Sequence, residues 1–375
     1  MSVTITQHPS SISFAGNPVL LKASSNLSGK TFLKICAKVT VALYMGSVKK
    51  SESEHSLSIP TEGGSSPVTF NLSDVLSSGL SLNPVERNFA LAGGAATVTG
   101  GYVLYSVKVW DEYLDEYSEI VSTETTASVS SGARIAIPGK YTDMQRLTLS
   151  EDTASWLGGA KILSNKPDYE AVPVGGKITI PVFREADGTV SNTFDGTYDY
   201  GSHTFYGNSA SWKTFVLPPA AVPGQHFIGW TGMGLRAVYI HVVPQHPFAR
   251  YFEFVNRLGA VESIYTFGRA QRKSSLVQER QIKRHNTSFE PTTRYVKRTL
   301  QEEQTWELST GPVNREWAKW FSAEFFTAEQ TWMYSDAAGD MVPVIIESDE
   351  DISIYDESAA EVLDLQFKVT MCINE

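Results

Sequence analysis

Apolar and polar residues alternate along several stretches of the chain, and this is the period of a β-strand with one buried face. In residues 31–44 every odd position from Leu33 to Leu43 is apolar, with Lys34 and Thr40 between them. The end of the chain alternates most regularly, with apolar Leu363, Leu365, Phe367, Val369, Met371 and Ile373. A final strand this regular is expected to be docked in a sheet.

Turn residues divide the strand-like runs into three regions. Residues 1–130 are predicted to form a β-sandwich of immunoglobulin-like size. Residues 131–248 are predicted to form a second small β domain, with strands in the runs KITIPVF, SWKTFVLP and LRAVYIHVVP and a hairpin-turn signal at Asp187-Gly188. The cluster GGAATVTGG from Gly93 to Gly101 is expected to be a flexible hairpin tip, because it lacks the strand–turn–helix context of a phosphate site.

The third region, residues 249–375, is predicted to be β-rich with one helix packed on a sheet. Two short strands are expected around a turn at Leu258-Gly259, and the helix is expected in NREWAKWFSAEFFTA with Asn314 as its N-cap. Its aromatic residues recur at helical spacing and predict a stripe that faces the core, namely Trp317, Trp320, Phe321 and Phe325.

A long hairpin is predicted within this third region. Its arms are expected at Ser263–Gln281 and Ser288–Glu303, each spanning roughly 50–60 Å at the rise of a β-strand. Ordinary strands are much shorter, so a hairpin of this length should project past its own domain. Its exposed edges would then need a partner.

Composition agrees with a mainly β, globular chain. The 375 residues are 42% hydrophobic and 19% charged, which excludes a chain disordered by composition. No run of 18 apolar residues predicts a membrane-spanning helix. The first residues, MSVTITQHPS, lack the pattern of a secretory signal. Cys36 and Cys372 are expected to be reduced thiols, with one disulfide between them as the alternative.

Charge is distributed unevenly along the third region. Between Arg250 and Leu300 there are eleven basic and four acidic residues, a net +7, whereas residues 301–375 carry three basic and seventeen acidic residues, a net −14. The chain as a whole has a formal net charge of −10. A basic arm therefore lies next to an acidic remainder.

The charge of the basic arm has three interpretations. Sequence-specific nucleic-acid binding is disfavoured, because the chain is acidic and has no recognisable nucleic-acid motif. Head-to-tail contact between copies, closing into a ring, and neutralisation within one chain remain alternatives. The residues predicted at a subunit interface are Arg269, Arg272, Lys273, Arg280, Lys283, Arg284, Arg294, Lys297 and Arg298.

Catalytic and metal-binding motifs are not found. There is no phosphate loop, dinucleotide fingerprint, zinc-protease motif or nucleophile elbow, and neither cysteine has metal-ligand spacing, so we expect no enzyme activity, cofactor or metal. Asp195 and Asp199 are candidate paired carboxylates of a glycoside-active enzyme, the weakest of three functional hypotheses. Solvated loop carboxylates explain them more simply.

The middle region is rich in aromatic residues among Gly, Asp and Asn. Such loops can stack on the apolar faces of sugars, so a glycan-binding adhesin or receptor-binding module is the alternative function. Its candidate contact residues are Trp212 and Trp230. Core packing is the competing interpretation of both.

Short motifs spread over all three regions resemble proteins of tailed-bacteriophage tails. ISFAGNPV and GGAKILSNKPD resemble prophage tail-tip or baseplate proteins, and TWELSTGPVNREWAKWFSAEFFTAEQTWM with VPVIIE and the terminal strand resembles the tube-like β domain with one helix found in such tails. The resemblance implies a virion structural subunit, assembled in the host cytoplasm, that forms a ring with copies of itself and contacts other tail proteins. It implies no enzyme activity and no cofactor.

Overall fold

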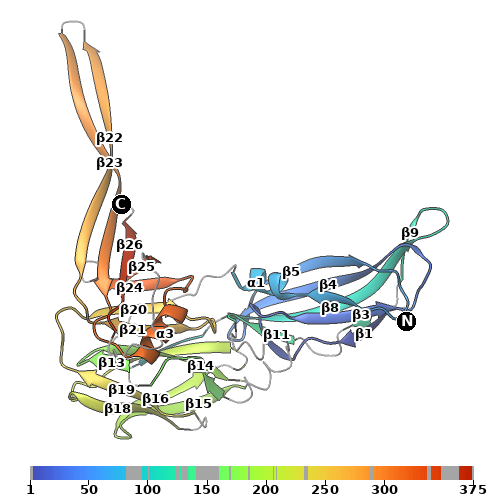
Figure 1. Ribbon diagram of the computed structural model, residues 1–375, viewed down its shortest axis with the longest axis horizontal. Coiled ribbons are helices and arrows are strands. Elements are labelled where there is room, and N and C mark those ends of the chain that lie inside the picture. The colour runs from blue at the N-terminus through green and yellow to red at the C-terminus, as the bar shows by residue number, and fades with distance from the viewer. Residues whose placement is uncertain are drawn as a thin grey trace.

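A computed structural model describes most of the chain and shows that it is mainly β, as predicted. The described residues are 3–81, 95–99, 101–123, 127–128, 134–140, 160–168, 170–184, 186–205, 207, 209–231, 235–287, 290–335, 339–347 and 363–373. Two β-sandwich units are followed by a sheet that carries one packed helix and a long hairpin (Figure 1). Within the described residues no helix is both long and apolar enough to cross a membrane.

The N-terminal unit is a β-sandwich. Its small sheet has the order β1-β3-β6, with bounds Val3–Gln7, Leu20–Ser25 and Val68–Asn71. Its large sheet has the order β2-β11-β8-β4-β5, with β9 and β10 also paired to β8. The bounds are β2 Ile12–Phe14, β11 Arg134–Ile137, β8 Gly101–Leu114, β4 Thr31–Met45, β5 Val48–Pro60, β9 Ile120–Ser122 and β10 Ala127–Ser128. Helix α1 (Ser73–Ser81) packs over β4 and β8.

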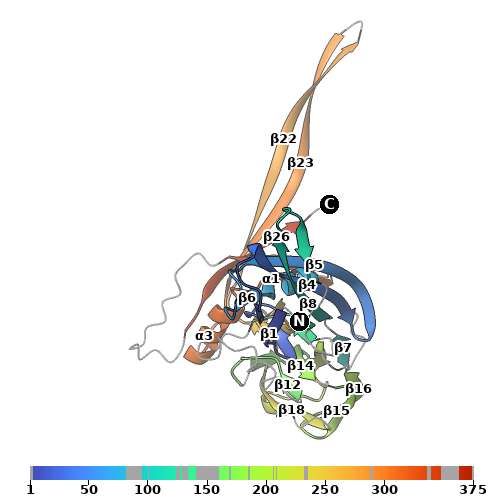
Figure 2. The same cartoon turned by 90° about the vertical axis from the view of Figure 1, so that its right-hand side faces the viewer.

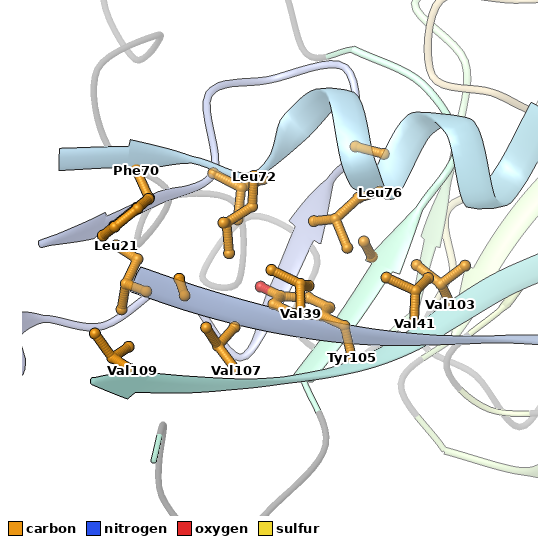
Figure 3. Close-up of a cluster of buried hydrophobic side chains, with 14 of the residues drawn as sticks. Leu21, Val39, Val41, Phe70, Leu72, Leu76, Val103, Tyr105, Val107 and Val109 are labelled. Carbon is orange, nitrogen blue, oxygen red and sulfur yellow. The ribbon is translucent and has the colours of Figure 1, made fainter. Parts of the chain in front are cut away.

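The apolar positions predicted from alternation form the core of this sandwich (Figure 3). Val39 and Val41 of β4 and Val107 and Val109 of β8 are at most 2% exposed. The two β4 valines lie beneath Leu76 of α1, and Val109 lies towards Leu21 and Phe70. Because successive residues of a strand point to opposite faces, the intervening polar residues remain on the other side of the sheet.

The thiol of Cys36 lies in the same large sheet. It is buried and free, and burial raises its pKa to about 11. The reduced state predicted for Cys36 agrees with this, since a thiol with so high a pKa stays protonated.

The middle unit is a second sandwich of two sheets. The four-stranded sheet has the order β12-β14-β17-β7, with bounds Ala160–Ile162, Lys177–Arg184, Ser209–Val216 and Ala95–Thr99. The five-stranded sheet has the order β13-β19-β18-β15-β16, with bounds Glu170–Pro173, Val238–Val243, Gly224–Thr231, Gly188–Phe194 and Tyr198–Phe205. The three strands predicted here from the sequence correspond to β14, β17 and β19.

Two local predictions about turns are wrong. Residues 95–99 of the glycine cluster form strand β7, which pairs antiparallel with β17 at one edge of the four-stranded sheet of the middle unit. Asp187-Gly188 joins β14 to β15, which lie in different sheets. The hairpin turn in this region lies instead between β15 and β16, where Asp195 has a positive φ of 51°.

The C-terminal unit is one seven-stranded sheet with a helix. Its order is β21-β20-β24-β25-β26-β23-β22, with bounds Val261–Thr266, Arg250–Val255, Thr331–Ser335, Asp340–Glu347, Gln366–Ile373, Glu290–Ser309 and Gln271–Thr287. Helix α3 (Arg315–Glu324) begins at Asn314, whose side chain accepts a hydrogen bond from the Trp317 amide. The predicted cap is confirmed, and the predicted aromatic stripe packs into the core against Phe252, Phe254 and Phe367.

All three units meet at one apolar junction. Phe14 and Ile137 of the N-terminal sandwich, Phe183 of the middle sandwich, and Leu258 of the C-terminal sheet are all at most 1% exposed in the same cluster. One face of the four-stranded sheet therefore packs on the five-stranded sheet, and the other face packs on neighbouring units. This double coverage explains why β14 is buried along nearly its whole length.

The hairpin differs in its boundaries from the prediction. Its arms are β22 and β23, with 17 and 20 residues, and the chain turns between Thr287 and Glu290. The predicted first arm began too early, because residues 261–266 pair with β20 as a separate short hairpin. The predicted return arm began two residues before β23 and ended six residues before the end of that strand. The expectation that the hairpin projects beyond its own sheet is confirmed (Figures 1 and 2).

Candidate functional site

The outer part of the hairpin is held by its own two strands. Strand β26 pairs with β23 along Glu302–Ser309 and ends there. Beyond it, residues 278–287 pair with residues 290–299, and no third described strand pairs with either (Figure 1). We call these two segments the distal hairpin. At the rise of a β-strand each segment extends about 33 Å.

The distal hairpin is strongly basic. Its sequence carries six basic residues against Glu279 and Glu290. The register places Arg280 directly opposite Lys297, and Lys283 directly opposite Arg294. Like charges at directly opposed positions of an antiparallel pair are destabilising.

One opposed pair in this segment has compensating charge, namely Glu279 and Arg298. Because positions alternate between faces along a strand, the face of Arg280, Arg284 and Lys297 has no acidic position within the distal hairpin. A two-stranded ribbon is marginally stable in water even without such repulsion.

The base of the hairpin behaves differently. Lys273 forms an ion pair with Glu307, which stands diagonally across from it, opposite Gln271. The lysine lowers the pKa of Glu307. The guanidinium of Arg272 lies 5.6 Å from the centre of the Trp306 ring, a cation–π arrangement. Arg269 is exposed in the segment before β22.

The predicted interface residues therefore divide into two groups. Arg272 and Lys273 have partners within the chain, as the intrachain interpretation expected, and Arg269 lies exposed beside them. The others occupy described strand positions in the distal hairpin, but their side chains lie outside the described part: Arg280, Lys283, Arg284, Arg294, Lys297 and Arg298. The structure brings these six together on one projecting ribbon.

The predicted sugar contacts lie in packed positions. Trp212 is 4% exposed and stands opposite Pro181 on the face of the four-stranded sheet that meets the neighbouring units. Trp230 packs on the middle core, with its ring 5.8 Å from that of Phe215. The ring of Trp212 is covered, so it has no free face for a sugar, and the competing core-packing interpretation applies to it.

The candidate carboxylate pair has structural hydrogen bonds. Asp195 accepts from His226 Nδ1 at 2.6 Å and from the Phe227 amide at 3.0 Å, and Asp199 accepts from the Gly201 amide at 2.8 Å. Both carboxylates thus stabilise turns of the five-stranded sheet. No group of three potential metal ligands is found among the described residues.

Sequence reasoning missed a buried ionic cluster between the middle and C-terminal units. Lys166 Nζ lies 2.7 Å from Glu170 Oε2 and 3.9 Å from Glu262 Oε1, and both carboxyl groups are almost fully buried. We call these three residues the carboxylate cluster. Burial raises the pKa of Glu170, and it raises that of Glu262 to about 7 despite the nearby ammonium.

The cluster is part of a polar seam between the units. The amide of Thr179 in β14 donates to Ser263 Oγ, and the amide of Lys177 donates to the Tyr265 hydroxyl, both at 2.8 Å. Strand β12 pairs with β14 only near the C-terminal end of β14. Side chains of β21 accept hydrogen bonds from the β14 backbone amides that β12 does not reach. Isolated acidic residues in strand-like runs gave no sequence signal for this arrangement.

Comparison with known proteins adds only distant likenesses. No protein-family model and no curated protein matches the chain. Among solved structures it is similar to fibronectin(III)-like modules of Clostridium thermocellum CbhA (11% identity, TM-score 0.15, 65% of this chain and 94% of that one). It is also similar to part of a bacterial ice-binding adhesin (12% identity, TM-score 0.18, 79% and 96%) and to a biofilm-associated BSP domain (7% identity, TM-score 0.19, 82% and 63%). These likenesses are too distant to bear on function.

Proposed function

We propose that this chain is a non-enzymatic structural subunit that uses its distal hairpin to join neighbouring copies of itself. The supporting observation is the projecting ribbon, on which like charges are opposed and which no other described strand covers. A ribbon of this kind gains stability when an acidic surface is laid against it.

A second copy of the chain is the partner we propose. Residues 347–364 contain eight acidic residues and no basic residue, so each copy carries both the basic ribbon and a complementary acidic stretch. Contact between unlike surfaces of identical subunits is heterologous, and it closes into a ring when the rotation between subunits permits.

The motifs of the sequence suggest where such a ring would work. They resemble tail-tip and baseplate proteins of tailed phages, so we propose a virion subunit that also contacts other tail proteins. In this proposal the two sandwiches lie outside the ring and the seven-stranded sheet contributes to its wall.

The assembly state of the full chain tests the proposal. Sedimentation and negative-stain imaging of the purified protein should show ring-shaped oligomers whose abundance falls as salt rises, because salt screens the charges. Replacing both Arg280 and Lys297 by Glu should abolish the oligomers. The matched control replaces the exposed Lys50 and Lys108 of the N-terminal sandwich by Glu.

Each double variant changes the net charge of the chain by the same amount. Comparing the two therefore separates a specific contact made by the hairpin from a general effect of net charge. Loss of oligomers in the hairpin variant alone supports the proposal. A chain that stays monomeric at high concentration, or oligomers that both variants leave intact, would contradict it.

A further inference from the structure

The core of the middle sandwich contains a lysine whose amine forms no ion pair with any carboxylate of the described residues. Lys213 of β17 is 0% exposed, and its amine donates to Oδ1 of Asn192, which is also 0% exposed. β17 belongs to the four-stranded sheet and β15, with Asn192, to the five-stranded sheet. The contact therefore spans the sandwich from one sheet to the other.

The surroundings of this lysine are apolar. The amine lies 4.9 Å from the centre of the Phe215 ring, and the same-face neighbours of Asn192 on β15 are the core residues Val190 and Phe194. Burial lowers the pKa of Lys213 to about 7, although the charge of Asp199 opposes this. A large fraction of the amine is then neutral at neutral pH, and a neutral desolvated amine is a nucleophile.

Three more polar atoms near this contact are buried without a hydrogen-bond partner in the described structure: Asn192 Nδ2, Ser211 Oγ and Trp230 Nε1. Ser211 lies two residues before Lys213 on the same face of β17. Trp230 stands directly opposite Asn192 in the pairing of β15 with β18. Native cores rarely leave so many polar atoms unsatisfied in one place.

We propose that Lys213 and Asn192 form an intramolecular amide bond that joins the two sheets of the middle sandwich. The lone pair of Nζ attacks Cγ of Asn192, the new C–N bond forms, and the bond from Cγ to Nδ2 breaks. One proton passes from Nζ to Nδ2, so that ammonia leaves. The step needs no oxidant, reductant or bound cofactor.

Two neighbouring groups assist this step. Oδ1 gains negative charge as the amine adds, and the unpartnered indole N–H of Trp230 is a donor next to Asn192 by register. The hydroxyl of Ser211 both accepts and donates, so it can carry the proton from Nζ to Nδ2. Neither group is consumed.

The bond would explain why a lysine is retained in an apolar core. An amide is neutral, so the burial cost of an ammonium disappears once the bond forms. The cross-link closes the segment between positions 192 and 213, which restricts the unfolded chain as a disulfide does. The inference does not depend on the function proposed above.

Intact mass spectrometry of the full chain tests the proposal directly. We expect a mass lower by one molecule of ammonia than the sequence requires. After proteolysis, tandem spectra should show one branched peptide in which Lys213 is joined to the segment of Asn192. Lys213→Met should have the full mass of its sequence, and Asn192→Asp should be lighter than its sequence by one molecule of water in place of ammonia.

The wild-type mass decides the matter even if a variant fails to fold. A full-mass chain whose Lys213 reacts with an amine-directed label after unfolding would overturn the proposal. So would a loss of ammonia that maps to a succinimide at any asparagine, because the Lys213 amine would then remain free.

Discussion

Arg280 and Lys297 stand directly opposite each other on the two arms of the distal hairpin. A charge that repels its cross-strand neighbour destabilises the isolated ribbon, so Arg280→Glu should create an attractive pair. In the monomer we expect this change to stabilise the ribbon by about 0.2–1 kcal/mol, read as slower amide hydrogen exchange in residues 278–299. The same variant should associate more weakly with other copies.

These two effects have opposite signs, which makes the variant informative. Gln278→Glu is the control, because its opposed residue is Thr299 and no cross-strand ion pair results. A hairpin that exchanges faster in Arg280→Glu would show that the opposed charges are already compensated within one chain.

The carboxylate cluster should make stability depend on pH. Glu262 has a reference pKa of 4.5, and burial raises it to about 7 in the folded chain. The folded state therefore binds the proton more tightly than the unfolded state between these values, and the free energy of unfolding falls as the pH rises from about 4.5 to 7. A pKa difference of this size corresponds to about 3 kcal/mol.

Urea unfolding at pH 5 and pH 8 measures this effect. Glu262→Gln cannot titrate, so its free energy of unfolding should change less between the two pH values than that of the wild type. The pKa of Glu170 is also raised, and Lys166 lies near both carboxyl groups. Part of the pH dependence of stability should therefore remain in Glu262→Gln. If the free energy of unfolding changed by the same amount between pH 5 and pH 8 in both proteins, the assignment to Glu262 would be contradicted.

Lys166 is the cation that both carboxyl groups of the cluster share. Lys166→Met leaves two buried carboxyl groups without it, and removing one partner of a buried ion pair costs about 3–5 kcal/mol. The loss should be larger at pH 8 than at pH 5, because protonated carboxyl groups do not need the ammonium. Thermal unfolding at both pH values checks this, with the exposed Lys50→Met as the control.

Much of the fold could be predicted from the sequence because its signals are local. The alternation of apolar residues from Leu33 to Leu43 indicates a strand with one buried face, and Asn314 before an apolar stripe indicates a capped helix. The basic composition of the hairpin arms was visible as well. These features depend on residues a few positions apart.

The remaining features depend on contacts between distant segments. Lys213 has the parity of the apolar Phe215, yet a lysine in a strand normally indicates a solvent face, so its burial could not be anticipated. The pairing of β7 with β17 joins residues more than a hundred positions apart. Trp212 was a candidate sugar contact with core packing as the competing interpretation, and its burial depends on the units that pack on its sheet.

Gly139 and Gly259 show how closely two units approach at the apolar junction. Their φ angles are +102° and +76°, and the Lys140 amide donates to the Arg257 carbonyl at 2.5 Å beside them. A Cβ on Gly139 would lie 2.2 Å from the carbonyl carbon of Leu258, and one on Gly259 would lie 2.3 Å from that of Pro138. Both contacts are with backbone, which cannot move without separating the units.

Gly139→Ala and Gly259→Ala should therefore each destabilise the junction by more than the conformational strain alone. Gly175 is the matched control, since its φ is +73° and an added Cβ would meet nothing within 4 Å. Gly175→Ala should cost about 1–2 kcal/mol from the left-handed backbone conformation. Gly139→Ala and Gly259→Ala should each cost more stability than Gly175→Ala. Small-angle scattering of these two variants should show the N-terminal sandwich displaced from the other units. Equal losses in all three variants would mean that the backbone contact at the junction contributes nothing beyond strain.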